Sequence, residues 1–325
     1  MQAVVRDARF DETFKILFGE IGAENRAISF LNAVLGHNSE TDRIKKIQFL
    51  DRSLISVKGR SIHYDIKIQG LCETYSGHSF IIEMQKCRAP SHINRWMYYC
   101  ARELTAIGKR LYRAANSSSG YGPDALVQKT YYAGLRPVKM IVILDFDSLE
   151  LQKELENSRD AVVHWKIRED ASLRVASNMM SWTYVILPRF SSSLPPSENH
   201  LDFTGKVLEA WLYLMTREDS ERVLVTKELV ANDLALAEGF YRISHLTPAE
   251  DDAVLEGQVA FATLMEIQNE KFDLGAKMKS EEIAVKMLLR EISLDEIVSI
   301  SGLSLQEIQA IASAIASGKA GHPSS

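Results

Sequence analysis

Cysteine is scarce in this sequence of 325 residues, which contains only Cys72, Cys87 and Cys100. The number is odd, and no two of the three have the CxxC spacing of a metal site. This argues against a disulfide scaffold and favours reduced thiols in a cytosol. Cys87 has no recognisable histidine partner, so we do not interpret it as a nucleophile.

Long apolar runs and an excess of positive charge are also missing. No run approaches the ~18 to 20 apolar residues of a membrane span, and charged residues interrupt the N-terminal segment where a secretory signal would be apolar. The formal net charge is −5, so any contact with nucleic acid must depend on a local basic surface. We expect a cytoplasmic protein without a membrane segment.

The rest of the composition is that of an ordinary soluble globular chain. Hydrophobic residues make up 46% of the sequence and charged residues 25%, values typical of a folded domain with a sizeable core. The length suits one large domain or two modest ones.

Two segments of alternating polarity lie between Ser61 and Gln85. In each, apolar residues occupy every second position, a pattern typical of a half-buried strand. The stretch between them, bounded by Gly70 and Gly77, is turn material and indicates an antiparallel hairpin. A loop centred near Thr74 then sets the register of the pairs.

This register places two carboxylates face to face, because Asp65 lies directly opposite Glu83. It also sets His63 opposite Gln85, while Lys67 shares the face of Asp65 and points toward the rim. Cross-strand partners have Cβ atoms about 5 Å apart, so facing carboxylates repel unless a cation lies between them or one is protonated. The alternative is an exposed sheet face on which two charges are merely neighbours.

A basic helix is expected directly after the hairpin, from Pro90 to about Ala115. Most of its cations recur every seven residues, nearly two helical turns, and therefore form one stripe. Such a stripe either follows the phosphates of a nucleic acid or is only a solvated face. Trp96, Tyr98 and Tyr99 are interpreted as core packing rather than base stacking. The stripe comprises Arg88, Arg95, Arg102, Lys109 and Arg113.

Two helices and five further strands are expected in the first 190 residues. The first helix, within residues 7–19, starts with acids that complement its dipole, and the second helix, residues 24–35, ends before Gly36. The further strands are expected at residues 44–50, 54–57, 138–146, 164–167 and 183–187.

The chain changes to helices after residues 191–200, a linker rich in serine and proline. Three short helices between residues 281 and 316 have the outline of a helix-turn-helix module. Acids outnumber bases there, so we expect packing or self-association rather than DNA reading. Helices are also expected at residues 206–214, 221–238 and 248–276.

Asp65, followed by Glu83, Met84 and Gln85 at the end of an apolar strand, resembles the active-site signature of the PD-(D/E)XK nuclease superfamily. More narrowly, the pattern resembles the Rpn-type recombination-promoting nucleases, also described as transposases, in which glutamine commonly replaces the final lysine. Further matching positions are Asp11, Phe14 and Lys15, then Arg95 with Tyr98 and Tyr99, and the segment 132–146.

The resemblance implies an α/β fold. A PD-(D/E)XK restriction-endonuclease-like core, a mixed sheet flanked by helices, would occupy residues 1–190 and precede an all-helical C-terminal region. The linker would occupy residues 191–200 and a helical region residues 201–280. A small helix-turn-helix-like module would follow at residues 281–318, before a disordered tail at residues 319–325.

The resemblance also implies a metal site. Asp65, Glu83 and the backbone carbonyl of Met84 would hold Mg²⁺ or Mn²⁺, and the ion would activate water and neutralise charge on the scissile phosphate. Gln85 would orient water without supplying charge, and Lys67 is the candidate for the missing cation. Asp11, Glu12 and Lys15 would contact the metal ligands or metal-bound water without binding the metal directly.

Together these features predict a metal-dependent DNA endonuclease of the recombination-promoting or transposase type, with little sequence specificity. Its partner would be DNA, double-stranded by resemblance, and the helical C-terminal half offers a route to a homo-oligomer. The alternative is a nuclease fold with weak or lost catalysis that serves as a DNA-binding or assembly module, for which Gln85 is the evidence. An effector that acts on a protein partner is a third hypothesis and depends only on the C-terminal helices.

Overall fold

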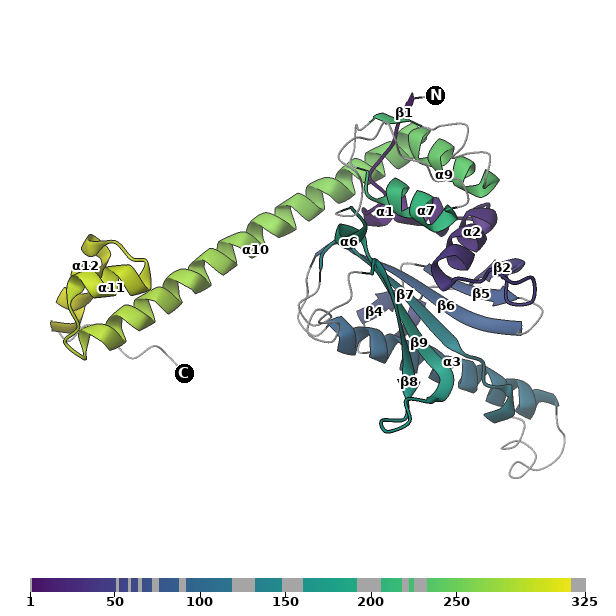
Figure 1. Ribbon diagram of the computed structural model, residues 1–325, viewed down its shortest axis with the longest axis horizontal. Helices are drawn as coiled ribbons and strands as arrows, with labels where there is room; N and C mark the ends of the chain where they lie inside the picture. Colours follow the sequence, from purple (N-terminus) through teal and green to yellow (C-terminus); the bar gives the residue numbers. More distant parts are fainter. Residues whose placement is uncertain are drawn as a thin grey trace. The chain divides into compact units, whose positions relative to one another are not determined.

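A six-stranded mixed sheet is the central layer of the first part of the chain (Figure 1). In sheet order, its strands are β2 (Lys46–Phe49), β5 (Ile66–Leu71), β6 (Ser76–Gln85), β7 (Val138–Leu144), β9 (Val175–Ile186) and β8 (Val162–Arg168). β7 lies parallel to both β6 and β9. The other neighbours are antiparallel, so the sheet combines a hairpin with a parallel centre.

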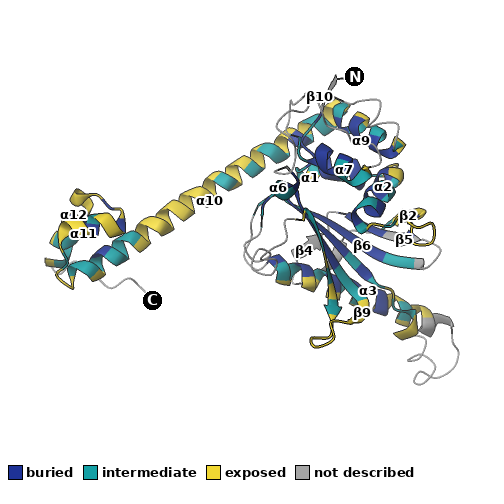
Figure 2. Ribbon diagram, viewed as in Figure 1, coloured by how far each residue is buried: buried dark blue, intermediate teal, exposed yellow. Residues whose placement is uncertain are grey.

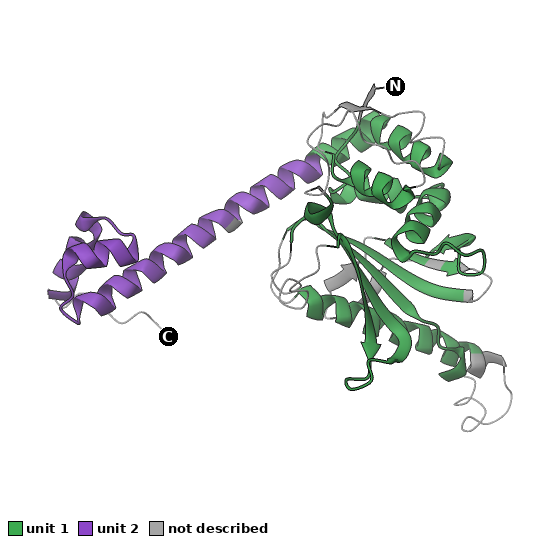
Figure 3. Ribbon diagram, viewed as in Figure 1, with its two compact units in different colours: residues 1–255 green, residues 256–325 purple. Residues whose placement is uncertain are grey.

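The computed structural model describes residues 2–50, 53–57, 60–63, 66–71, 76–87, 92–118, 132–147, 160–191, 206–217, 222–224 and 233–316. The chain divides into two units, residues 1–255 and residues 256–325, which Figure 3 colours separately. The sheet belongs to the first unit. The more detailed domain division that the sequence suggests stays a prediction.

Strand β7 is buried on both faces, as its nearly continuous apolar sequence predicts. Val142 belongs to the core beneath α3 (His92–Ser118). Its neighbour Ile141 belongs to the core shared with α1 (Asp11–Phe18) and α2 (Glu24–Leu35). Successive residues of a strand point to opposite faces, so helices on both faces require apolar residues at every position.

Two later helices, α7 (Val207–Met215) and α9 (Leu234–Ser244), join α1 and α2 on one face of the sheet. Trp211 of α7 is fully buried, with ring centroids 5.2 Å from Phe18 and 6.2 Å from Phe30. Aromatic pairs at such distances add to the free energy gained by burying apolar area. Figure 2 shows the resulting burial along α7.

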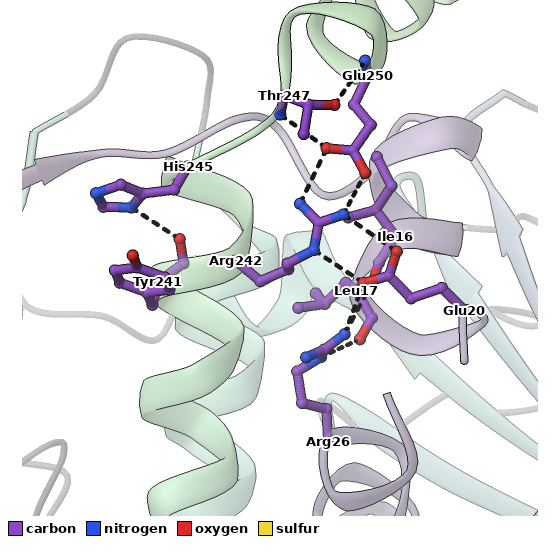
Figure 4. Close-up of polar contacts among 9 residues, drawn as sticks. All are labelled: Ile16, Leu17, Glu20, Arg26, Tyr241, Arg242, His245, Thr247 and Glu250. Atoms are coloured by element: carbon purple, nitrogen blue, oxygen red, sulfur yellow. Dashed lines mark hydrogen bonds and ion pairs between the residues drawn. The ribbon is translucent and has the colours of Figure 1, made fainter. Parts of the chain in front are cut away.

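Arginine side chains connect these helices to the start of α10 (Pro248–Leu288) (Figure 4). The Arg242 guanidinium lies between two carboxylates, with Nε 2.9 Å from Glu20 Oε1 and Nη1 3.2 Å from Glu250 Oε2. Arg26 also binds Glu20, at 3.0 Å. The hydrogen bond from Arg242 lowers the pKa of Glu250 to about 2, with help from the backbone N–H of Thr247. The network therefore fixes the first turn of α10 to α1 and α2.

In the second unit, the C-terminal part of α10 packs with α11 (Leu294–Ser301) and α12 (Leu305–Ala316). α11 ends at Gly302, which has a positive φ of 70° and so adopts the left-handed conformation that glycine tolerates best. The small core consists of Ala284, Ile297, Leu303 and Ile308.

Most of the helices and strands agree with the sequence, but two predicted helices are wrong. Within residues 221–238, the chain first forms β10 (Arg222–Leu224), which pairs with β1 (Gln2–Val4), and α9 begins only at Leu234. Residues 281–291 do not start a helix of their own, because α10 continues to Leu288. The alanine, lysines and methionine between residues 276 and 279 are good helix formers and provide no stop.

The predicted fold class is confirmed: a mixed sheet flanked by helices is followed by helices in the C-terminal region. Short α6 (Leu187–Ser191) is the last described element before the predicted linker. The predicted linker beyond Ser191 and the predicted tail lie outside the described residues. Among the helices that the structure describes, none is both long and apolar enough to cross a membrane.

Candidate active site

The predicted hairpin is present as β5 and β6, and its register is the predicted one from Ile66 to Gly70, before it shifts by one residue at Leu71. Lys67 lies opposite Ile81. Asp65 lies outside the described residues. Continued by one residue beyond Ile66, the same register would set Asp65 opposite Glu83, so this facing pair stays a prediction.

One predicted pair is wrong. His63 ends β4 (Arg60–His63) and lies opposite Ser53 of β3 (Ser53–Val57), instead of opposite Gln85. The alternation in the sequence suggested one continuous strand from Ser61 onward. The structure divides it, because β4 forms a small sheet with β3 while β5 pairs with β2 and β6.

Glu83 is a carboxylate close to the carboxyl end of β6, and it is only 8% exposed. It is in register with Val142 of β7, the central strand. Ile81 belongs to the core beneath α3, whereas Ile82 belongs to the core on the opposite face. By alternation, Glu83 therefore lies on the α3 face. A carboxylate so far from water needs a cation, a hydrogen bond or a proton to compensate its burial.

Lys67 is buried on the same face and does not reach an exposed rim. Its Nζ lies 2.7 Å from Oε2 of Glu103 on α3, which is fully buried. The other oxygen of Glu103 accepts hydrogen bonds from Ser79 and Arg110, at 3.3 and 3.2 Å. Glu103 was not assigned a role from the sequence, although its position as the single acid of the expected basic helix is a signal that could have singled it out. The ion pair joins α3 to the sheet and compensates the charge of Lys67.

Gln85 is the last residue of β6, and both the nitrogen and the oxygen of its side-chain amide form hydrogen bonds. Its Nε2 donates to the backbone carbonyl of Cys87 at 2.9 Å, and its Oε1 accepts a hydrogen bond from Arg95 of α3. The Arg95 guanidinium also lies 6.0 Å from the ring centroid of Tyr99. A positive charge therefore contacts the neutral residue that stands where the family signature has lysine.

The remaining cations of the predicted stripe are arranged along α3. Arg102 donates to the hydroxyl of Tyr98 at 3.1 Å, and Lys109 and Arg113 are exposed. Arg88 lies outside the described residues. The aromatic residues differ, since Trp96 is fully buried whereas Tyr98 is 45% exposed. The core interpretation thus holds for the tryptophan but not for this tyrosine.

Asp11, Glu12 and Lys15 lie on the surface of α1. The two acidic side chains are 57% and 45% exposed, and Lys15 forms ion pairs with both. These contacts are typical of charges spaced three and four residues apart on a helix. The predicted contribution of these residues to a metal site stays a prediction.

A second charged cluster, absent from the predicted site, lies where β6 and β7 end. Asp7 is 4% exposed and accepts from Arg9 Nε at 2.8 Å and from Lys86 Nζ at 3.1 Å. Arg9 also binds Asp145 at 3.2 Å, and the Asp145 backbone N–H donates to the carbonyl of Gln85 at 3.0 Å. Burial raises the pKa of Asp145, and the charge of Arg9 opposes this shift. The cluster ties the end of β6 to the N-terminal segment.

The donor chemistry fits a hard divalent cation, although the described residues hold only part of a ligand set. Among them, no group of three or more histidine, cysteine, aspartate or glutamate side chains is arranged to hold a metal ion. Glu83 supplies carboxylate oxygen, the ligand that Mg²⁺ and Mn²⁺ prefer. The predicted second carboxylate, Asp65, lies outside the described residues.

The mixed sheet, the hairpin ending in Glu83-Met84-Gln85 and the helix α3 beside it define a nuclease-type α/β core. The chain belongs to the family described as PD-(D/E)XK nuclease family transposase, whose model matches residues 8–253. The resemblance seen in the sequence is thereby confirmed, and the family supports a nuclease or transposase type of function. Comparisons with curated proteins and with solved structures gave no significant match.

Proposed function

We propose that this protein is a metal-dependent endonuclease that hydrolyses phosphodiester bonds in double-stranded DNA with little sequence specificity. One observation carries the proposal. Buried Glu83 lies two residues before Gln85, and Arg95 binds that glutamine. A buried carboxylate near the end of a strand, next to a glutamine that binds an arginine, is typical of a site that binds a charged phosphate.

A divalent cation, Mg²⁺ or Mn²⁺, would lower the pKa of a bound water and offset charge on the scissile phosphate. Glu83 and Asp65 would hold it through carboxylate oxygens, together with the backbone carbonyl of Met84. Burial of Glu83 on the α3 face keeps competing water away, which strengthens the electrostatic interactions of the carboxylate.

The missing lysine needs a substitute, and Arg95 is better placed for this role than Lys67. Lys67 forms a buried ion pair with Glu103, so its charge is already compensated. Arg95 contacts the amide of Gln85 and can donate further hydrogen bonds, because a guanidinium has five N–H groups. We infer that Arg95 stabilises charge on the phosphate while Gln85 holds the guanidinium in place.

The exposed cations of α3 would bind the DNA backbone next to the site. Lys109 and Arg113 lie further along the same helix and are exposed. Contacts to phosphates position a duplex but carry no base information. This arrangement supports cleavage with little sequence preference.

A binding module without catalysis is the competing function. The specific observation in its favour is that contacts to Cys87 and Arg95 occupy both groups of the Gln85 amide. A glutamine held in this way is less free to orient a water molecule than the lysine of the family signature. In this alternative, DNA binding would survive the loss of Glu83.

Cleavage of supercoiled plasmid by the full chain separates the two functions. We expect nicking by wild type with Mg²⁺ or Mn²⁺, none with EDTA, and a fall of about 100-fold or more for Glu83→Gln and for Asp65→Asn, since removing even an outer partner of a metal ligand costs about 10- to 100-fold. Glu270→Gln removes an exposed carboxylate from α10 and is the matched control. If no metal supports cleavage while salt-sensitive DNA binding survives Glu83→Gln, the endonuclease proposal is wrong and the binding module is correct.

A further inference from the structure

One half of the sheet face opposite α3 is polar. Toward the carboxyl ends of β7 and β9, this face presents Ile141, Ile143 and Val185, which belong to the core shared with α1 and α2. Toward the amino ends, the same face presents Lys139 and Ser181. Figure 2 shows the change along β9, which is buried near its carboxyl end and exposed near its start.

The edge strand β8 extends this polar region. Val163, Trp165 and Ile167 pack against the core beneath α3. The alternate residues therefore point to the opposite face. These alternate residues are His164, Lys166 and Arg168, and all three are exposed.

The cations form a line across neighbouring strands. Lys166 lies opposite Ser181 of β9, and Ser181 lies beside Lys139 of β7. With strands about 4.8 Å apart, the backbones of Lys139 and Lys166 are roughly 10 Å apart. Duplex DNA carries one charge per about 1.7 Å of its axis, so about six phosphate charges fall within that distance.

Among the described residues, no carboxylate forms an ion pair with Lys166. Arg168 donates to the carbonyl of Leu173 at 2.6 Å, which orders the turn between β8 and β9. The nearest acids in sequence are Glu169 and Asp170 in that turn. Because the chain as a whole carries −5, the positive charge here is a local feature.

The positive charge of this face contributes to lowering the pKa of three histidines. Burial lowers the pKa of His78 to about 4, and the charge of Lys139 adds to the effect. The same two causes, in the same order, lower the pKa of His37 to about 4. Partial desolvation of the imidazole ring also lowers the pKa of His164, followed by the charges of Lys166 and Lys139. The histidines are therefore neutral near pH 7, and the positive potential comes from the lysines and arginine.

We propose that Lys139, Lys166 and Arg168, here called the basic half-face, form a second binding surface for the phosphate backbone of DNA. This inference depends on the proposed function for its substrate class. The basic half-face and the cations of α3 lie on opposite faces of the sheet, so one straight duplex cannot contact both. One chain can then hold two DNA segments, one at the candidate active site and one at the basic half-face.

The test measures how the full chain binds a fluorescent DNA duplex across a series of salt concentrations, in EDTA to prevent cleavage. Lys166→Gln/Arg168→Gln removes two exposed cations, and Lys271→Gln/Arg290→Gln removes two exposed cations of the second unit as a matched control. Each lost phosphate contact should reduce the slope of log K against log salt by about 0.9. We expect a slope smaller by about 1.8 and an affinity lower by about 10-fold for the first variant only.

A second measurement asks whether bead-bound wild-type protein that has captured one duplex also retains a second, differently labelled duplex. We expect Lys166→Gln/Arg168→Gln to lose the second duplex, and Lys109→Gln/Arg113→Gln to retain one duplex at the basic half-face. The inference is overturned if Lys166→Gln/Arg168→Gln has the same salt slope as wild type and still captures the second duplex. If wild type also cleaves plasmid, the proposed function stays intact. If wild type neither binds nor cleaves DNA, both proposals fail. Binding of polyglutamate that depends on Lys166 and Arg168 while DNA binding does not would assign the surface to an acidic protein partner instead.

Discussion

Two lysines of the same sheet, Lys67 on β5 and Lys166 on β8, have opposite surroundings. Lys67 is 6% exposed and forms an ion pair with Glu103 at 2.7 Å. Lys166 is exposed and has no carboxylate partner among the described residues. The strands are alike in their alternation, and the difference comes from α3, which covers Lys67 and brings an acid to it. A buried lysine therefore holds the fold together, whereas an exposed one is available to a polyanion.

The largest effect that tests this comparison is on stability. Glu103→Leu removes the buried carboxylate that lies 2.7 Å from Lys67 Nζ, and breaking a buried pair in this way costs about 3 to 5 kcal/mol of unfolding free energy. The double variant Lys67→Met/Glu103→Leu should recover most of the loss, since it removes both members of the buried pair. Urea unfolding followed by circular dichroism measures both.

Lys166→Gln is the matched control, and we expect it to change the unfolding free energy by less than about 0.5 kcal/mol because the side chain is exposed. If Glu103→Leu unfolds at the wild-type urea concentration, the ion pair is not structural, and the contrast between the two lysines is lost.

An intermediate effect concerns activity and compares two cations of α3. Arg95 binds Gln85, whereas Lys109 is exposed and lies about four helical turns beyond Arg95 on α3. We expect Arg95→Met to lower kcat for plasmid cleavage by about 100-fold, the lower end of what one lost stabilising donor costs. Lys109→Gln should raise KM by a few-fold with kcat nearly unchanged, because it removes only backbone binding.

Arg95→Lys restores the charge but not the planar geometry of the guanidinium, so partial activity is expected. Equal losses of kcat in Arg95→Met and Lys109→Gln would contradict a special role for the cation that contacts Gln85.

The smallest effect concerns an ion pair of intermediate exposure, Glu250 with Arg242. The pKa of Glu250 is about 2 in the folded chain, below its ordinary value of about 4.3. The pair therefore contributes stability that is fully present above about pH 4.5 and is lost as the pH falls through about 2. Because the carboxylate is partly exposed, solvent screening limits the contribution to about 1 kcal/mol or less.

Thermal unfolding of wild type and Glu250→Gln between pH 6 and pH 2 measures this contribution. The difference in Tm between them should shrink as the pH falls. Glu256→Gln, an exposed glutamate of the same helix, is the control and should parallel wild type. A constant difference between wild type and Glu250→Gln across this range would show that the titration of Glu250 is not the cause.

Much of the fold could be predicted because local patterns specify it. Alternation and the turn predicted the hairpin register, which the structure shows in the pairing of Lys67 with Ile81, and Gly36 marked the end of α2. The patterns failed where local signals are weak. His63 continues an alternating run, yet its partner is Ser53. Alternation alone does not decide which neighbouring strand a given strand pairs with.

The candidate site was predicted in part. The sequence pointed to Glu83 and Gln85, since acid and amide at the end of an apolar strand form a recognisable pattern. It did not predict that Arg95 would bind Gln85 or that Asp7 would accept hydrogen bonds from Lys86. These contacts join segments that are distant in the chain or belong to different elements, and no periodicity relates them.

The sequence by itself determined most of the strands and helices, the register of the hairpin and the family, because these depend on spacing along the chain. Only the tertiary structure decided the role of each charge. Lys67 meets Glu103 because α3 crosses that face of the sheet. Lys139 and Lys166 form a surface because β7 and β8 flank β9 in an order that differs from their order in the chain. The electrostatic free energy of a charged side chain depends on its burial and on nearby charges, and the spacing of residues along the chain does not determine either.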